Sequence, residues 1–343
     1  MGEARTAYLV RMARLRKVSP SMRGWTRRRA GKGFSYVDHE GHTLPSEEVE
    51  RIRSLAIPPA WQSVWICPLA NGHIQAVGTD DAGRRQYLYH PHWRVKRDKL
   101  KYDRILAAAA QLPAARRQVT RDLHASGMPR ERAAAVAVRL LDLGYFRIGS
   151  DAYADANGSF GLTTLERQHV RKTKNGLVFR FMGKSGVEHT ITIDDDEVMA
   201  ALDRMRGRRT RSKRLLAYND ARRWADLDAA AVNAYLGTVL GGDLTAKDFR
   251  TWHGTVLAAA ALAASEEPGD TKASRRRAVK AAVEEVASYL GNTPAIAKNS
   301  YIDPRVLDLY EAGTVAEVPR MTARTSPARR QRLLEKAVLD LLS

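Results

Sequence analysis

The period of the hydrophobic pattern changes along this chain, and that change limits its possible folds more than any other feature. Between residues 34 and 93, short alternating runs of apolar and polar residues are separated by turn residues, which is typical of β-strands. Beyond residue 104 the pattern is mainly helical, with one return to alternation between residues 168 and 193. The sequence therefore predicts an α+β fold with a small β-rich N-terminal domain, residues 1–95, and a larger, mainly helical domain, residues 100–343.

The β-rich domain carries one strong hairpin signal, the dipeptide Asn71-Gly72 between two alternating runs. In the last strand of this domain, the period of two places Arg85, Tyr87 and Tyr89 on one face. The basic residues 1–30 are expected to wrap loosely over a surface. The predicted strands are 34–37, 64–69, 73–78 and 84–89, and a short helix is expected after the capping residue Ser46.

In the helical domain, a helix break is expected at Pro113, and Pro129 is expected to open a helix that ends before Gly144. The charged run 94–104 is the predicted domain junction. The apolar stripe of the helix after Pro129 is predicted to be Val136, Leu140 and Leu143. Further helices are predicted at 104–112, 115–125, 220–240, 245–264, 275–290 and 329–342 and at the acidic run 194–197.

The return to alternation predicts a three-stranded β meander inside the helical domain, with strands at 168–171, 177–182 and 187–193. A glycine-flanked turn, 183–186, joins the last two strands. This arrangement places Lys184 at the tip of a hairpin.

The charge of the chain points to a polyanionic partner. Lys and Arg number 57 against 38 Asp and Glu, a net charge of +19, and nucleic acid is the commonest partner for such a field. Cys67 is the only cysteine, which excludes an intrachain disulfide and a cysteine metal cluster. His90 and His92 lack a third ligand nearby, so no metal site is predicted. No apolar run approaches the ~20 residues of a membrane span, and a reducing cytosol is expected.

Five residues form a coherent set for chemistry at a phosphodiester, although each alone is an ordinary structural residue type. Tyr301 offers a nucleophilic hydroxyl, because a phenol with a pKa of ~10 can attack and later leave. Arg147 and Arg250 offer planar guanidiniums for nonbridging oxygens. Lys184 can act as general acid, and Asn292 adds a neutral hydrogen-bonding side chain.

The segments around these residues resemble those of the type IB DNA topoisomerases, in particular the poxvirus-like and bacterial enzymes. The similar segments follow the same order from about residue 34 to residue 303, and the terminal one has the same nine-residue step to the tyrosine. They are the base-reading strand at 83–89, the first arginine motif at 146–149, the segment after it at 157–165, the lysine hairpin at 181–184, the second arginine segment at 244–251 and the terminal segment at 292–301.

The resemblance implies a C-shaped clamp formed by the two domains around duplex DNA. Tyr301 would form a 3′-phosphotyrosyl link, Lys184 would protonate the leaving 5′-hydroxyl with help from Arg147, and Arg147 and Arg250 would stabilise the transition state. Rotation of the cut strand and religation would relax supercoils of either sign without ATP, metal or other cofactor. The resemblance and the sequence around the similar segments also imply a set of DNA-binding residues, which are Gln86, Tyr87, Tyr89, Tyr153 and Lys247.

The same resemblance implies that double-stranded DNA is the partner, with no membrane and no obligate protein partner. One copy is enough to form a clamp, so a monomer is expected. The expected location is the cytoplasm, in association with the nucleoid.

The chain departs from the poxvirus enzymes at several positions near the site. Asn292 stands where they carry His, and an amide can donate a hydrogen bond to an oxygen but cannot carry charge, so a different pH response is expected. Ser185 replaces an Asp, and Ser150 and Ala152 replace lysines. The cleavage-site preference of the poxvirus enzymes is therefore not expected to transfer.

Two other functions fit parts of the pattern. A tyrosine recombinase shares the chemistry, but the chain has Lys247 where recombinases usually carry His, and its β-rich domain differs from their helical one. A non-catalytic nucleoid-binding protein would fit the net charge alone.

Several candidate DNA contacts also have a structural alternative. Tyr87 and Tyr89 would serve equally as cross-strand packing residues, and Lys247 as a solvated helix lysine. The basic run 204–214 is expected to be a loop that touches phosphates without reading sequence. The helix at 329–342 is expected to pack on the catalytic domain and not to recruit a partner.

Overall fold

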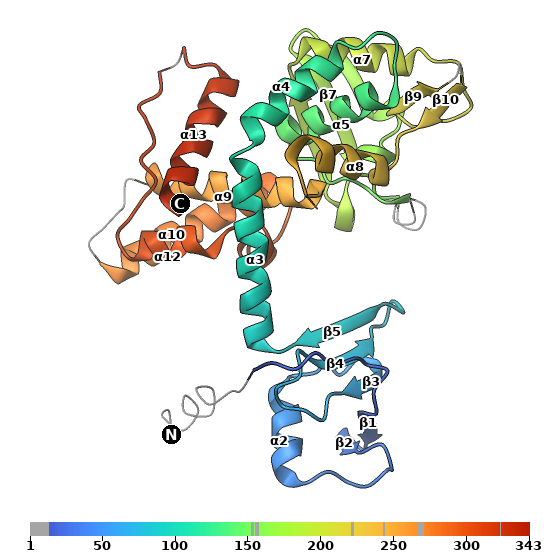
Figure 1. Ribbon diagram of the computed structural model, residues 1–343, viewed down its shortest axis with the longest axis vertical. Helices are drawn as coiled ribbons and strands as arrows, with labels where there is room; N and C mark the ends of the chain where they lie inside the picture. The colour runs from blue at the N-terminus through green and yellow to red at the C-terminus, as the bar shows by residue number, and fades with distance from the viewer. Residues whose placement is uncertain are drawn as a thin grey trace. The chain divides into compact units, whose positions relative to one another are not determined.

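The computed structural model describes residues 14–151, 154, 158–220, 223–242, 244–265, 271–322 and 324–343. The chain forms two compact units, Met1–Lys101 and Tyr102–Ser343. Helix α3 (Pro91–Ala109) carries the chain from the first unit into the second (Figure 1). The charged run 94–104, predicted to be the domain junction, is continuous helix, with its charges largely exposed and the neighbouring Tyr102 and Ile105 buried.

The first unit is built on a five-stranded antiparallel sheet with the order β2-β1-β3-β4-β5. Helix α2 (Ser46–Ser54) buries Ile52 in one apolar cluster with the sheet residues Ile66 and Ala76. The strands are β1 (Trp25–Ala30), β2 (Gly33–Val37), β3 (Gln62–Ile66), β4 (Ile74–Thr79) and β5 (Arg85–Tyr89).

The pairing of the two strands that flank Asn71-Gly72 is confirmed, but their connection is longer than a tight hairpin turn. Strand β3 ends at Ile66 and neither turn residue has a positive φ angle. The buried Gln75 accounts for this loop, because its Nε2 donates to the carbonyl oxygens of Leu69, Ala70 and Gly72. A buried amide thus satisfies carbonyls that a shorter turn would have paired internally.

The expectation that residues 1–30 wrap loosely is wrong for β1, which pairs with both β2 and β3. Arg27 explains why a basic segment is held in a sheet. Its Nη1 donates to the carbonyl oxygens of Ile57 at 3.2 Å and Pro58 at 3.1 Å, and its Cζ lies 4.1 Å from the ring centroid of Phe34.

Ser46 is the first helical residue of α2 and makes no capping hydrogen bond, so its predicted capping role is also wrong.

The second unit is mainly helical and contains a separate three-stranded antiparallel sheet, order β6-β7-β8. Its helices are α4 (Leu112–Leu123), α5 (Arg130–Gly144), α7 (Asp196–Arg206), α8 (Ala229–Leu240), α9 (Ala246–Ala263), α10 (Lys272–Leu290), α11 (Pro294–Ser300), α12 (Pro304–Glu311) and α13 (Pro327–Leu342). Its strands are β6 (Val170–Thr173), β7 (Gly176–Met182), β8 (Glu188–Ile193), β9 (Ala217–Asp220) and β10 (Arg223–Asp226). Within the described ranges, no helix combines the length and the apolar character that a membrane crossing requires.

Two predictions between residues 194 and 240 fare differently. The helix start at the acidic run is confirmed, because the Asp195 carboxylate accepts a hydrogen bond from the Val198 backbone N–H at 2.9 Å. The helix predicted at 220–240 begins only at Ala229, because β9 and β10 pair as a hairpin before it.

In the basic run 204–214, Arg208 is buried and donates to the Met205 and Leu215 carbonyls, so it holds the fold together and is not a phosphate contact.

The C-terminal end of α5 also differs from the prediction. Gly144 is the last helical residue and Tyr145 takes the left-handed capping conformation, with φ of 52°. Glycine is required there for packing, since a Cβ on Gly144 would lie 2.3 Å from the Phe146 ring. Leu143, predicted to be on the buried stripe, is 40% exposed.

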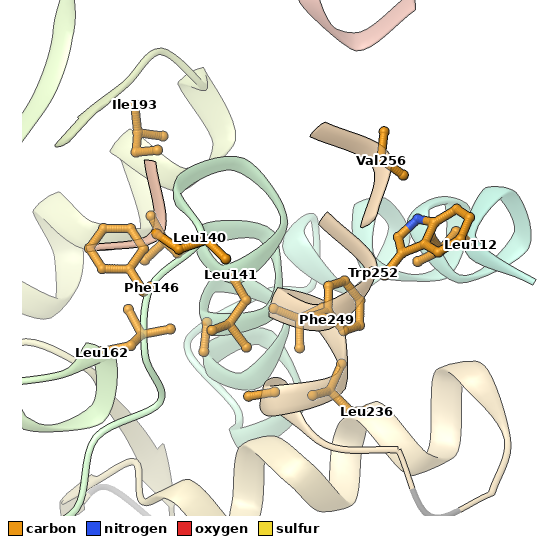
Figure 2. Packing of buried hydrophobic residues seen from close by; sticks show 14 of the residues in the cluster. Leu112, Leu140, Leu141, Phe146, Leu162, Ile193, Leu236, Phe249, Trp252 and Val256 are labelled. Carbon is orange, nitrogen blue, oxygen red and sulfur yellow. The ribbon is translucent and has the colours of Figure 1, made fainter. Parts of the chain in front are cut away.

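Helix α5 forms the centre of the core in the second unit, because it is apolar on almost every side and is buried accordingly. Each fully buried leucine in such a helix contributes roughly 1.5–3 kcal/mol through the hydrophobic effect. Figure 2 shows Leu140 and Leu141 of α5 among their neighbours in the cluster, which include Leu112, Phe146, Leu162, Ile193, Leu236, Phe249, Trp252 and Val256.

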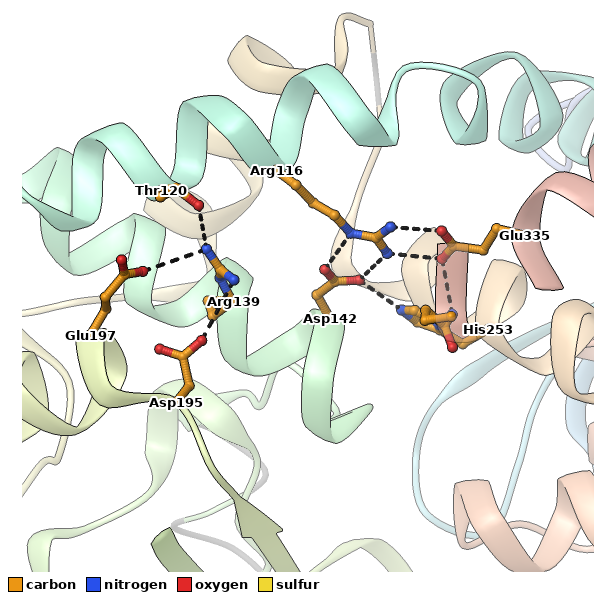
Figure 3. Close-up of polar contacts among 9 residues, drawn as sticks. Arg116, Thr120, Arg139, Asp142, Asp195, Glu197, His253 and Glu335 are labelled. Carbon is orange, nitrogen blue, oxygen red and sulfur yellow. Dashed lines mark hydrogen bonds and ion pairs between the residues drawn. The ribbon is translucent and has the colours of Figure 1, made fainter. Parts of the chain in front are cut away.

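A buried ion-pair network ties the C-terminal helix α13 to α4, α5 and α9 (Figure 3). The Arg116 guanidinium lies between two carboxylates, with Nε 2.7 Å from Asp142 Oδ2 and Nη1 2.6 Å from Glu335 Oε2. His253 Nε2 lies 3.4 Å from Asp142 Oδ1. Because the arginine bridges the two carboxylates, this group joins the helices as a structural network, and α13 packs on the second unit as predicted.

We expect Asp142→Asn to destabilise the second unit by about 3–5 kcal/mol at neutral pH, because it removes one of the two charged partners of the largely buried Arg116 guanidinium. Burial alone would raise the pKa of Asp142, but Arg116 and His253 hold that pKa well below its usual range. The stabilisation is therefore complete above about pH 4 and is lost as the pH falls below that value. Urea unfolding at several pH values should show this loss in the wild type and a weaker one in the variant. The exposed Asp340→Asn change, at the surface pair with Lys336, should cost less than about 1 kcal/mol.

Candidate active site

Arg250 lies in the second turn of α9 and is 5% exposed. Its Nη2 donates to the carbonyl oxygen of Leu290 at 2.7 Å and its Nη1 donates to the carbonyl oxygen of Tyr145. Its Cζ lies 5.3 Å from the ring centroid of Tyr301. The ends of α5 and α10 therefore fix the plane of this guanidinium against the tyrosine ring.

Arg147 is held beside Asn292. Its Nη2 donates to the Gly291 carbonyl oxygen at 2.8 Å and to Asn292 Oδ1 at 2.6 Å. Gly291 ends α10 in the left-handed conformation, with φ of 59°, which turns the chain so that Asn292 faces the arginine. Since the Asn292 oxygen accepts from Arg147, its Nδ2 hydrogens remain on the other side of the amide, where one makes a long contact of 3.4 Å to the Leu290 carbonyl.

The electrostatics of this site favour an anion. The pKa of Arg250 is lowered to about 10, first by burial and then by repulsion from Arg147, while the interactions with Tyr301 act in the opposite direction. The guanidinium therefore stays charged at neutral pH. Within the described part of the chain, no carboxylate pairs with either arginine, and both Nε atoms are buried without a hydrogen-bond partner. A buried guanidinium and a half-buried guanidinium, neither of them paired with a carboxylate, are suited to a bound phosphate.

The backbone of Tyr301, at the end of α11, is fixed mainly by α9. The Asp303 N–H donates to Thr255 Oγ1 at 3.0 Å, and the Ile302 carbonyl accepts from the Tyr102 hydroxyl at 2.8 Å. Gly254 allows the closest approach, since a Cβ there would lie 2.5 Å from the Tyr301 carbonyl oxygen. Gly254 is one helical turn after Arg250, so the same face of α9 places both the arginine and the tyrosine.

If the site cleaves DNA as the sequence predicts, we expect Gly254→Ala to slow that cleavage by roughly 10–10²-fold, because the added methyl displaces Tyr301 from Arg250. The clash should also lower the free energy of unfolding by about 1–3 kcal/mol. Single-turnover cleavage and urea unfolding check the two effects. Gly207→Ala is the matched control, since its Cβ would meet the nearest atom, the Asp203 carbonyl oxygen, at an ordinary 3.4 Å and leave both values unchanged.

Lys184 lies in the turn that joins β7 and β8, where the sequence predicted it, and its side chain is exposed. The residue before it, Gly183, lines a cavity of about 410 Å³ together with Arg147 and Arg250. The structure therefore brings the lysine turn to the same cavity as the two arginines. Lys247 is exposed on the first turn of α9, one turn before Arg250.

The residues predicted to read DNA in the first unit do not share one surface. Tyr87 and Tyr89 lie on one face of β5, with ring centroids 6.0 Å apart, and the Arg85 Cζ lies 5.7 Å from the Tyr87 ring centroid. Gln86 is one residue before Tyr87 in the alternation and so lies on the other face, where its Nε2 donates to Asp80 Oδ2 at 2.9 Å. Tyr153 lies outside the described residues.

His189 and Tyr289 also line the 410 Å³ cavity, and sequence reasoning did not identify either of them. His189 is on β8 and Tyr289 is the penultimate residue of α10. A lone histidine in a strand and a lone tyrosine in a helix carry no motif. Only the positions of Phe181 and Phe146 in space show that His189 belongs to this part of the molecule.

Comparison with known proteins agrees with the geometry. Residues 90–315 match the family described as eukaryotic DNA topoisomerase I, catalytic core, and residues 33–80 match the bacterial DNA topoisomerase IB N-terminal domain. DNA topoisomerase 1B of Acanthamoeba polyphaga mimivirus is 28% identical over 299 residues, which cover 84% of this chain and 88% of the viral protein. DNA topoisomerase 1B of vaccinia virus (strain Copenhagen) is 20% identical over 249 residues, covering 72% and 75%. Since the catalytic-core match spans more than half of the chain, the chain belongs to the type IB DNA topoisomerases, which are isomerases.

Proposed function

We propose that this enzyme relaxes positive and negative supercoils by cutting one strand of duplex DNA through a 3′-phosphotyrosyl intermediate. The cut strand rotates about the intact one and is then resealed. The observation that supports this most strongly is the packing of the fixed Arg250 guanidinium across the Tyr301 ring. A phosphate bound by that guanidinium would lie within reach of the tyrosine hydroxyl.

In the cleavage step, the Tyr301 oxygen forms a bond to phosphorus while the bond from phosphorus to the 5′ oxygen breaks. The phenolic proton passes to solvent, and Lys184 supplies the proton that the leaving 5′ oxygen takes up, with Arg147 assisting. Arg147 and Arg250 offset the negative charge that builds on the nonbridging oxygens. The burial of Arg250 strengthens its part of that interaction, because the surrounding dielectric is low.

Asn292 is assigned a hydrogen bond from its Nδ2 to a nonbridging oxygen, while its Oδ1 holds Arg147 in place. The amide is neutral at every working pH, so it adds no titration of its own to the rate. Where the poxvirus enzymes carry a histidine, this chain thus uses a donor that also orients an arginine.

Resealing reverses the cleavage step, as the 5′-hydroxyl attacks phosphorus and the phenol leaves. The phosphotyrosyl bond keeps the energy of the broken phosphodiester, so the cycle needs no ATP. The positive charge at phosphorus comes from the arginines and lysine of the protein, so the proposed cycle uses no metal ion or other cofactor.

DNA binding is assigned to both units, which would close as a C-shaped clamp on the duplex. The exposed Arg85 and Tyr87 and the half-buried Tyr89 form an aromatic and basic face suited to DNA, while Gln86, Tyr153 and Lys247 are proposed as further contacts. We propose a monomer with double-stranded DNA as its substrate and no obligate protein partner, working in the cytoplasm on the nucleoid.

The test is relaxation of a supercoiled plasmid that lacks paired recombination sites, in EDTA and without ATP. We expect complete relaxation at less than one protein per plasmid supercoil, for plasmids of either sign of supercoiling. A tyrosine recombinase would leave the topology of such a plasmid unchanged or would need paired sites. A nucleoid-binding protein would restrain supercoils only in proportion to the amount added, and the effect would vanish when the protein is removed.

A further inference from the structure

Three aromatic rings form a column that runs through the catalytic segments of the second unit. The rings of Phe146 and Phe181 are nearly parallel, with centroids 5.9 Å apart and 18° between their planes. The His189 ring continues the column from Phe181 at 5.2 Å and 22°. Phe146 directly precedes Arg147, and Phe181 and His189 are cross-strand partners on the two strands that carry Lys184 between them.

At the end of this column, the His189 ring lies directly against two glycines. A Cβ on Gly183 would lie 2.5 Å from His189 Cδ2, and a Cβ on Gly291 would lie 2.6 Å from its Cε1. Both distances are shorter than real side chains allow, so the imidazole occupies the space that any other residue would fill at either position. Gly183 directly precedes Lys184, and Gly291 directly precedes Asn292.

The ring at this position is uncharged under ordinary conditions. Burial lowers the pKa of His189, and the nearby guanidiniums of Arg147 and Arg250 lower it further. A neutral imidazole fills the space without repelling the two arginines. It also leaves the cavity that these residues line without a third fixed cation.

We propose that His189 is a positioning residue for Lys184, because its ring is wedged between the fixed Gly291 segment and the hairpin that carries the lysine. Phe181 supports one face of the ring, and the glycine contacts hold its edges. The hairpin then cannot move closer to the end of α10, and the lysine amine is held where the 5′ oxygen leaves. This inference rests on the proposed function, since it requires Lys184 to protonate that oxygen.

The test compares two leaving groups in single-turnover cleavage, on a duplex built around a cleavage site mapped with the wild-type protein. One duplex is ordinary DNA, and the other carries sulfur in place of the 5′ bridging oxygen at the scissile bond. A thiolate leaves without help from an acid, because a thiol pKa of ~8.5 is far below that of an alcohol or water, ~15.7. The cleavage rate of the sulfur duplex therefore depends on every part of the site except the proton donor.

We expect His189→Ala to cleave the ordinary duplex about 10²-fold more slowly and the sulfur duplex within about threefold of wild type. His189→Phe keeps a ring in the column and should stay within about fivefold of wild type on both duplexes. The matched control is His169→Ala, which removes another partly buried imidazole, one that packs on Phe160 at 4.4 Å, and should leave both rates unchanged.

A second variant covers the case in which His189→Ala does not fold. Gly183→Ala has an ordinary φ of −95°, so its only fault is the clash of the new methyl with the ring. It should show the same selective loss on the ordinary duplex, and Gly183→Ala combined with His189→Ala should not add a further loss.

The inference is overturned if the His189 and Gly183 variants slow both duplexes equally, or if neither variant slows either duplex. Lys184→Ala separates this failure from that of the proposed function. If Lys184→Ala is rescued by sulfur and the His189 variants are not, only the positioning role is wrong. If Lys184→Ala is slowed equally on both duplexes, the lysine is not the proton donor and the inference falls with that assignment.

Discussion

Tyr301→Phe is expected to abolish plasmid relaxation and the covalent protein–DNA complex, with a loss of at least about 10⁴-fold in the rate of cleavage. The change removes one oxygen and leaves the ring that packs under Arg250. Without that oxygen no covalent intermediate can form at residue 301. Relaxation gels and denaturing gels of trapped complexes measure the two losses.

Binding distinguishes the loss of the nucleophile from the loss of the fold. Since affinity for DNA comes mainly from Lys and Arg contacts to phosphate, the variant should bind duplex DNA with the same salt dependence as the wild type. Tyr218→Phe is the matched control, because it removes a phenolic hydroxyl from strand β9, away from Arg250, and should relax plasmids at the normal rate. Relaxation by Tyr301→Phe at more than a trace level would assign the nucleophile to another residue.

Arg250→Lys is expected to reduce the cleavage rate by about 10²–10³-fold, nearly as much as Arg250→Ala. The conservative change keeps the positive charge but removes the planar fork that the Leu290 and Tyr145 carbonyls hold. An ammonium at this site cannot contact both carbonyls and a phosphate with the same geometry. Single-turnover cleavage under saturating protein measures the chemical step without a contribution from binding.

The same experiment tests whether charge alone is enough. If Arg250→Lys cleaves within about threefold of wild type, the fixed plane of the guanidinium has no catalytic importance and the site acts only as a source of charge. Arg276→Lys is the control, because Arg276 is exposed on α10 and the change should leave cleavage unchanged.

Short contiguous motifs made the catalytic candidates visible in the sequence, whereas the contacts that position them were not visible. Arg147, Lys184, Arg250 and Asn292 each stand in a local setting of a few residues, and the structure places their segments at one site. The hydroxyl of Tyr102, which holds the backbone beside Tyr301, comes from 200 residues away. Contacts at such separations leave no periodic signal in a single sequence.

The errors in the fold have a related cause, because side chains satisfied backbone groups or filled space in ways that the rules for turns and helix caps do not include. Strand β1 reads as a basic surface segment until Arg27 is seen to bind the carbonyls of Ile57 and Pro58. The connection between β3 and β4 is longer than its turn signal predicts, because the buried Gln75 pairs with the carbonyls of the loop. Gly144 was assigned to a helix cap by residue type, but the Phe146 ring requires it for space.

Identification of the DNA-linked residue tests the central claim most directly. The protein is trapped on nicked or suicide DNA, digested with protease, and the peptide that stays attached to the DNA is sequenced by mass spectrometry. The account predicts one peptide, linked through Tyr301 to a 3′ phosphate, with a free 5′-hydroxyl on the departing strand. A peptide linked through another residue or to a 5′ phosphate would contradict it, as would plasmid relaxation with no DNA-linked peptide recovered.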